Sequence, residues 1–138
     1  ITRGSISRMI DVSVGFDESK IDYRADGVII STATGSTAYS MAAGGPIVDN
    51  DLNALVISPV AVHSLNATPM VLAKDKKITV AFDNTRNQDI YVSFDGNNHH
   101  RINENDTVTI KLSNKAINIY VAKNMGQFTK VDKKLKLR

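Results

Sequence analysis

The chain has 138 residues, of which 42% are hydrophobic and 22% charged, and its formal net charge is +3. This length fits one domain with a real core, and the composition is ordinary for a globular protein. The chain has no apolar run near the ~18 residues that span a bilayer, no basic-plus-apolar leader and no cysteine. These features exclude disulfides, cysteine chemistry and a membrane-spanning helix, and they favour a cytoplasmic protein.

Residues 5–14 predict a strand with one exposed face. Ile10, Val12 and Val14 alternate with polar residues, which is the period of a half-buried strand. Residues 15–19 then predict a turn, because glycine, aspartate and serine gather there.

Residues 26–46, DGVIISTATGSTAYSMAAGGP, are the most informative stretch of the chain. Val28, Ile29 and Ile30 are consecutive β-branched residues, which favour a strand buried on both faces. Small residues with hydroxyl groups follow, and these groups can both donate and accept hydrogen bonds. They are Ser31, Thr32, Thr34, Ser36 and Thr37. We expect a turn that lets the backbone approach a ligand bearing a phosphate or a sugar.

A short helix is predicted over residues 36–43. Ser36 or Thr37 would cap its start, and Gly44, Gly45 and Pro46 would end it. Free N–H groups at a helix start can bind an anion. The alternative, an ordinary core made of a strand, a turn and a helix, stays open at this point.

Shorter apolar runs predict further strands along the rest of the chain. Residues 54–58 predict one that ends before Pro59, and the others lie at 70–73, 77–82, 89–94, 107–112 and 116–122. Turns are predicted at 75–76, 84–88 and 95–98. His99 and His100 are expected in a solvated turn rather than at a metal, because adjacent strand residues point to opposite faces.

The positive charge is concentrated in the last nine residues, at Lys130, Lys133, Lys134, Lys136 and Arg138. No aromatic residue lies among them to stack on a base, so we expect no nucleic acid as partner. A membrane is not expected as partner either, since no apolar run is long enough to span one. Residues from 127 onward are interpreted as a solvated, loosely docked arm.

These predicted elements define the fold class. Helices of crossover length are missing between nearly all the strands, which excludes a parallel βαβ sheet. The fold is therefore expected to be mainly β, an antiparallel β-sandwich-like domain with one or two short helices. Residues 1–138 are expected to form a single domain.

The order of these motifs resembles the C-terminal, β-rich domain of the NAD kinase family over nearly the whole chain. The resemblance rests on the segments at 24–27 (RADG), 34–46 (TGSTAYSMAAGGP), 58–65 (SPVAVHSL), 95–97 (DGN) and 133–135 (KKL). It implies a phosphotransferase that converts NAD to NADP at the adenosine ribose 2′-hydroxyl. The donor would be ATP with a divalent metal, expected to be Mg.

The resemblance also implies which residues contact NAD or NADP. They are Arg8, Arg24, Asp26, Thr34, Thr37, Ala38, Tyr39, Ser40, Met41, Ala42, Ala61, His63 and Asn97. No catalytic residue and no protein ligand for the metal is assigned in this chain. Structural alternatives stay open: Asp26 as a turn residue, Tyr39 as a core ring, His63 as a hydrogen-bonded loop residue, and both arginines as surface ion-pair residues.

Departures from the family pattern stand at Ala33, Thr68 and Asn97, where proline, arginine and glutamine are usual. The family's Gly-Gly-Asp-Gly motif, whose aspartate acts as base, does not occur in these residues. The resemblance therefore implies that a missing N-terminal α/β domain completes the site and that this chain alone is inactive. It also implies a homo-oligomer formed through this domain, with some ligand contacts crossing between subunits.

Two other functions stay open. One is the matching domain of a lipid kinase of the diacylglycerol or sphingosine type, although those enzymes lack the TGSTAYS string. The other is a non-catalytic nucleotide-binding or oligomerisation module.

Overall fold

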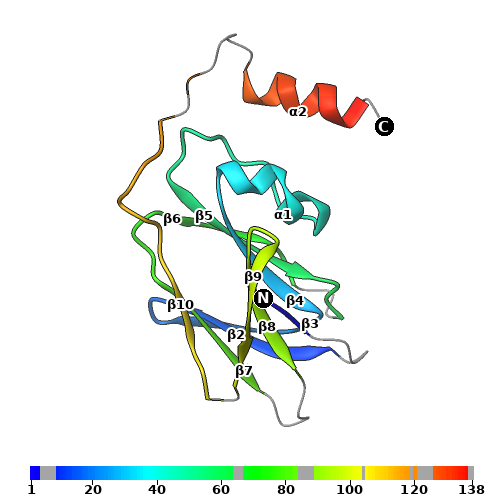
Figure 1. The fold of residues 1–138 in the computed structure, drawn as a ribbon, viewed down its shortest axis with the longest axis vertical. Helices are drawn as coiled ribbons and strands as arrows, with labels where there is room; N and C mark the ends of the chain where they lie inside the picture. Colours follow the sequence, from blue (N-terminus) through cyan, green and yellow to red (C-terminus); the bar gives the residue numbers. More distant parts are fainter. Residues whose placement is uncertain are drawn as a thin grey trace.

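The computed structural model describes residues 1–3, 9–63, 67–83, 89–103, 105–118, 120 and 126–136. Two antiparallel sheets make up most of this part of the chain (Figure 1). The six-stranded sheet has the order β6 (Met70–Ala73), β5 (Ala54–Val60), β4 (Gly27–Thr32), β1 (Thr2–Arg3), β8 (Ile90–Phe94) and β9 (Asn97–Ile102). The four-stranded sheet has the order β10 (Val108–Ile110), β7 (Ile78–Asp83), β2 (Ile10–Phe16) and β3 (Ser19–Ala25).

The main core joins apolar side chains from both sheets. Alternate residues of β2, namely Ile10, Val12 and Val14, are buried, and they belong to one cluster with Ile57 of β5 and Ile78 of β7. Full burial of such a side chain contributes about 1.5–3 kcal/mol. Because β2, β3, β5, β7 and β8 all give alternate residues to this cluster, the structure confirms the mainly β, antiparallel sandwich-like class.

A second cluster lies on the other face of β5. Ala54 and Val56 are buried there with Ala33 and Val48, which come from the segment that follows β4. The first six residues of β5 are therefore all buried. Two-faced burial was predicted for β4, where Val28 is fully buried but Ile29 and Ile30 are only partly so. The strand that is buried on both faces is β5, and its second face is covered by Ala33 and Val48 from the segment that follows β4.

Strand ends account for several differences from the predictions. β2 continues through Gly15 to Phe16, so the turn before β3 is only two residues long. A Cβ at Gly15 would lie 2.7 Å from the Thr79 Oγ1 of β7, so glycine serves close strand packing there. β3 was not predicted, although Ile21, Tyr23 and Ala25 alternate. Residues 5–8 of the predicted first strand lie outside the described residues.

Pro59 does not end β5 as predicted, because the strand runs on to Val60. Ile57 is the last residue of β5 in register with β6, whereas the pairing with β4 continues through Pro59. A strand with one open side tolerates a proline, since fewer ladder hydrogen bonds need its missing N–H.

The Asp95-Gly96 turn is confirmed, but it is shorter than predicted. Both residues have positive φ, 48° and 77°, as a two-residue type I′ hairpin turn requires. Asn97 therefore already pairs with Phe94, and His99 and His100 lie in β9 rather than in a turn. The pairing of the backbone overrides the low strand propensity of these residues. The turn predicted at 84–88 lies outside the described residues.

The C-terminal region differs most from the predictions. Within the predicted strand 116–122, the described residues 116–118 and 120 form no strand, and Ile117 and Tyr120 are 89% and 96% exposed. The expected arm is a helix, α2 (Gln127–Lys136). Phe128, Val131 and Leu135 follow the spacing of an amphipathic helix. Within the described residues, no helix has the length and apolar character needed to cross a membrane.

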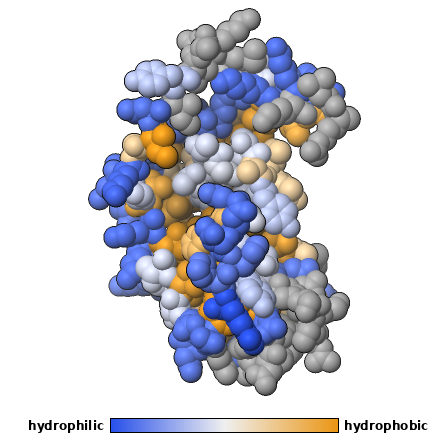
Figure 2. Space-filling model, viewed as in Figure 1, coloured by the Kyte–Doolittle hydropathy of each residue, from blue (hydrophilic) through white to orange (hydrophobic). Residues whose placement is uncertain are grey.

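α2 lies at one end of the molecule, beyond α1 (Tyr39–Ala42) (Figure 1). Figure 2 shows that hydrophilic side chains dominate the visible surface at this end, with apolar surface between them. Lys130, Lys133 and Lys136 of the helix are exposed, as predicted for the tail.

Candidate ligand-binding site

The small residues after β4 form a compact projection on the six-stranded sheet. The 3₁₀ helix η1 (Thr34–Thr37) and the one-turn helix α1 follow the strand directly. We call residues 34–42 the rim. Seven predicted ligand residues lie in it: Thr34, Thr37, Ala38, Tyr39, Ser40, Met41 and Ala42. Thr34, Ala38, Tyr39 and Ala42 are exposed, and Thr37 and Met41 are half-buried.

The predicted helix cap at Ser36 or Thr37 is wrong. α1 begins after Ala38, and no side chain caps it. Ser36 is buried and accepts a hydrogen bond from the Val48 N–H at 3.0 Å, while the Thr37 hydroxyl donates to the Thr34 carbonyl at 3.3 Å. These serine and threonine oxygens hold the turn together instead of capping a helix. A helix of four residues also has only a small dipole, so its start attracts an anion weakly.

The predicted end of the helix is confirmed. Gly44 has φ +85°, and its N–H donates to the Met41 carbonyl at 3.0 Å. The Gly45 N–H donates to the Ser40 carbonyl at 2.9 Å. This pair of bonds is a Schellman motif, which satisfies the last carbonyls of the helix.

Four other predicted ligand residues gather at the start of β4. The His63 N–H donates to the Arg24 carbonyl at 3.1 Å, and the Asp26 N–H donates to the Val60 carbonyl at 2.9 Å. Ala61 follows Val60 in the loop after β5. Its φ is 48°, a conformation that is strained for alanine. We call Arg24, Asp26, Ala61 and His63 the loop group. Arg24, Ala61 and His63 are exposed and Asp26 is half-buried.

The rim and the loop group lie at opposite ends of β4. That strand has six residues, so the two groups are separated by about 20 Å along it. Asn97 follows the hairpin turn between β8 and β9. β4 and β8 are both antiparallel to β1, so they run in the same direction, and the turn points to the same end of the sheet as the rim (Figure 1). Arg8 lies outside the described residues.

A hollow of about 840 Å³ separates the rim from α2. Thr37 and Met41 line it on one side, and Phe128 and Val131 on the other. Gln127 joins α2 to the body, because its side chain accepts a hydrogen bond from the Asn50 N–H at 2.8 Å and donates to the Val48 carbonyl at 2.9 Å. The sequence analysis did not predict that α2 residues line a hollow beside the rim. The helical spacing of Phe128, Val131 and Leu135 is the signal that could have indicated it.

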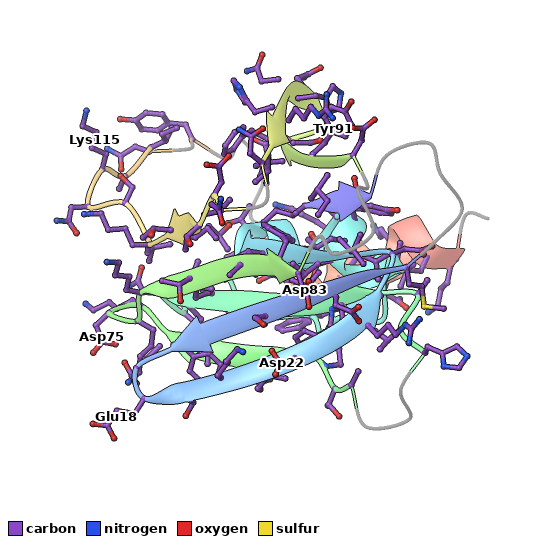
Figure 3. The ribbon with its side chains drawn as sticks, turned by 90° about the horizontal axis from the view of Figure 1, so that it is seen from below. Glu18, Asp22, Asp75, Asp83, Tyr91 and Lys115 are labelled. Carbon is purple, nitrogen blue, oxygen red and sulfur yellow. The ribbon has the colours of Figure 1, made fainter. Side chains whose placement is uncertain are left out.

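The outer face of the four-stranded sheet carries carboxylates near the loop group. Asp22 and Asp83, labelled in Figure 3, line a shallow hollow of about 450 Å³ with Arg24. Ser13 donates a hydrogen bond of 2.5 Å to Asp22, which lowers the pKa of that carboxyl group. Burial raises the pKa of the neighbouring Tyr23 phenol. Among the described residues, no three His, Asp or Glu side chains gather at metal-binding distance.

Comparisons with known proteins agree over nearly the whole chain. A family model described as the ATP-NAD kinase C-terminal domain matches residues 1–122. An NAD kinase of Caldanaerobacter subterraneus is 38% identical over 136 residues, which cover 98% of this chain and 48% of that protein. An NAD kinase of Chloroflexus aggregans is 40% identical over 129 residues, which cover 93% and 46%. The chain thus spans about half the length of these relatives.

Solved structures show the same likeness in three dimensions. An NAD kinase from Archaeoglobus fulgidus, in complex with ATP, aligns with a TM-score of 0.70 and 29% identity over 82% of this chain and 43% of its own. A yeast NADH kinase complexed with NADH aligns with a TM-score of 0.64 and 27% identity over 79% of this chain and 32% of its own.

Proposed function

Because the chain belongs to the ATP-NAD kinase C-terminal domain family, we propose that it is the dinucleotide-binding half of an enzyme that phosphorylates NAD. The product is NADP, formed at the adenosine ribose 2′-hydroxyl with ATP as donor, in the cytoplasm. The observation that carries this proposal is the rim, whose small and hydroxyl-bearing residues directly follow β4 and reach the surface at Thr34, Ala38 and Tyr39. The relatives described above are NAD kinases, so a lipid kinase is not favoured.

The side chains of the rim suit a dinucleotide. The hydroxyls of Thr34 and Thr37 can donate and accept hydrogen bonds with ribose and phosphate oxygens. The Tyr39 ring is 63% exposed, which leaves its face free to pack on a planar base. Ala38 and Ala42 are too small to obstruct a ligand. At the same end of the sheet, the Asn97 amide can hydrogen-bond to a polar group of the ligand.

The loop group has a different chemistry. The Asp26 carboxylate can accept hydrogen bonds from ribose hydroxyls or an amide, and the Arg24 guanidinium can pair with a phosphate. Since about 20 Å separates this group from the rim along β4, one copy of the chain presents two distinct half-sites. We therefore propose that the chain forms a homo-oligomer in which the loop group of one copy meets the rim of another.

Phosphoryl transfer needs more than a bound acceptor. It needs a metal-bound polyphosphate and a carboxylate near the accepting hydroxyl. The described residues include no cluster of carboxylates that would hold such a metal. We therefore propose that the other half of the protein, the N-terminal domain, binds ATP with its metal and supplies the base. This chain holds and orients the acceptor.

Titration calorimetry with NAD and NADP tests the binding function. We expect binding by the wild-type chain, and at least tenfold weaker binding by Asp26→Asn and Tyr39→Ala at unchanged melting temperature. Thr109→Ala on the distant strand β10 is the matched control and should bind as the wild type does. A folded wild-type chain that does not bind either dinucleotide at millimolar concentration would contradict the proposal.

A kinase assay tests whether the N-terminal domain supplies ATP binding and the catalytic base while this chain holds the acceptor. The isolated chain should form no NADP from NAD and ATP, whereas adding the N-terminal half should restore turnover. NADP formation by this chain alone would show that the catalytic base lies within it.

A further inference from the structure

Two buried hydroxyl groups connect the rim to the core. Ser58 lies in the middle of β5 and is fully buried, and Ser40 of α1 is 1% exposed. Their Oγ atoms are 2.8 Å apart, so each is the hydrogen-bond partner of the other. Both side chains are withdrawn from solvent and from any ligand on the outer surface.

Gly45 closes this pair off from water. A Cβ at position 45 would lie 2.5 Å from the Ser40 Oγ and closer still to the Ser58 Oγ. The backbone of the Schellman turn therefore passes directly over the two hydroxyls. If either serine loses its oxygen, no water has room to replace it, and the remaining hydroxyl is left without a partner.

α1 depends on such an anchor. Four residues make one helical turn, which is far below the roughly 12–15 residues that an isolated helix needs for stability. Ser40 is its only fully buried residue, and its neighbours in the chain, Tyr39 and Met41, point to the surface or toward the hollow. The orientation of Ser40 thus sets the orientation of both ligand-facing residues.

We infer that Ser58, through its hydrogen bond to Ser40, is a positioning residue that holds Tyr39 and Met41 in the orientation that receives the dinucleotide. The inference rests on the proposed function of the rim. Ser58 itself touches no ligand, since it is fully buried beneath the rim.

The test compares Ser58→Ala, Ser40→Ala and the double variant in titration calorimetry with NAD and in thermal unfolding. Each single variant should melt about 5 °C lower, because one buried hydroxyl loses its partner. The double variant has no unpaired hydroxyl, so its melting temperature should recover. Its NAD affinity should stay about tenfold below wild type, because the hydrogen bond that orients α1 is absent. A residue that served only stability would instead let affinity recover with the melting temperature.

Amide hydrogen exchange gives a readout that needs no ligand. The N–H groups of Ala43, Gly44 and Gly45 bond to carbonyls of the rim helix and report its order. In the double variant they should exchange at least tenfold faster, while amides of β2 keep their rates. Ser13→Ala, which removes a hydroxyl bond on the other sheet, is the control and should alter neither rim exchange nor NAD affinity.

The outcomes separate the two proposals. A wild-type chain that binds no NAD overturns the proposed function, and rim exchange then decides whether the serine pair orders α1. Wild-type rim exchange in the double variant, or wild-type NAD affinity where the wild-type chain binds, would overturn the inference about Ser58.

Discussion

Gly44 and Gly45 stand next to each other, yet they are glycines for different physical reasons. Gly44 has φ +85° and open space around its missing side chain, so only its backbone conformation requires glycine. Gly45 has no such φ, but a Cβ there would overlap the two serine hydroxyls and approach the Ser40 carbonyl to 2.8 Å. One glycine therefore serves the turn, and the other serves the contact beneath it.

Alanine substitutions should separate these two roles. Gly44→Ala should lower the free energy of unfolding by about 1 kcal/mol, the cost of a left-handed conformation for alanine. Gly45→Ala should cost more, because backbone atoms must move. Gly126→Ala is the control, since its Cβ also meets open space without a positive φ. Urea denaturation measures all three, and equal effects at positions 44 and 126 would contradict the conformational argument.

At the scale of elements, sequence periodicity predicted the strands whose side chains alternate or run apolar, such as β4, β5 and β7. It missed β9, because Asn97, Asn98 and the two histidines are poor strand formers and owe their conformation to pairing with β8. It assigned a strand to 116–122 because that run is apolar, but its described residues are exposed and have no neighbouring strand. In both cases the presence or absence of a neighbouring strand, rather than the propensity of the residues, decides whether a strand forms.

The prediction of the site was limited to residues that a local sequence pattern could indicate. Seven of its residues lie in the rim, within residues 34–42, so a local motif sufficed to predict them. The Ser40–Ser58 bond joins residues 18 positions apart, and nothing in the local pattern of β5 signals it. The distance between the rim and the loop group likewise follows from the length and direction of β4, which only the folded chain reveals.

Gln127 should control the docking of α2. Its two hydrogen bonds to the 48–50 segment contribute about 0.5–1.5 kcal/mol each, and a helix of ten residues is marginal without tertiary support. In Gln127→Ala, amide exchange in α2 should therefore be about tenfold faster. Asp132→Ala is the control, because it removes only an exposed ion pair with Lys136. Equal exchange in both variants would mean that other contacts hold the helix.

At the scale of the whole molecule, the two half-sites predict complementation between defective chains. A Tyr39→Ala chain keeps its loop group, and an Arg24→Ala chain keeps its rim. If each site combines the rim of one copy with the loop group of another, an equal mixture should recover about a quarter of the wild-type NAD sites. Calorimetry of the mixture against each variant alone measures this recovery. A mixture that binds no better than its components would show that each site is built within one chain.

β8, whose Tyr91 is labelled in Figure 3, packs Ile90 and Val92 into the core that it shares with the four-stranded sheet. Its link to β4 is β1, a strand of two residues in which Thr2 pairs with both Gly27 and Tyr91. So short a strand gives the hairpin of β8 and β9 few backbone hydrogen bonds to the rest of the sheet. The position of Asn97 relative to the rim is therefore set mainly by the packing of Ile90, Val92 and Ile102 in the core.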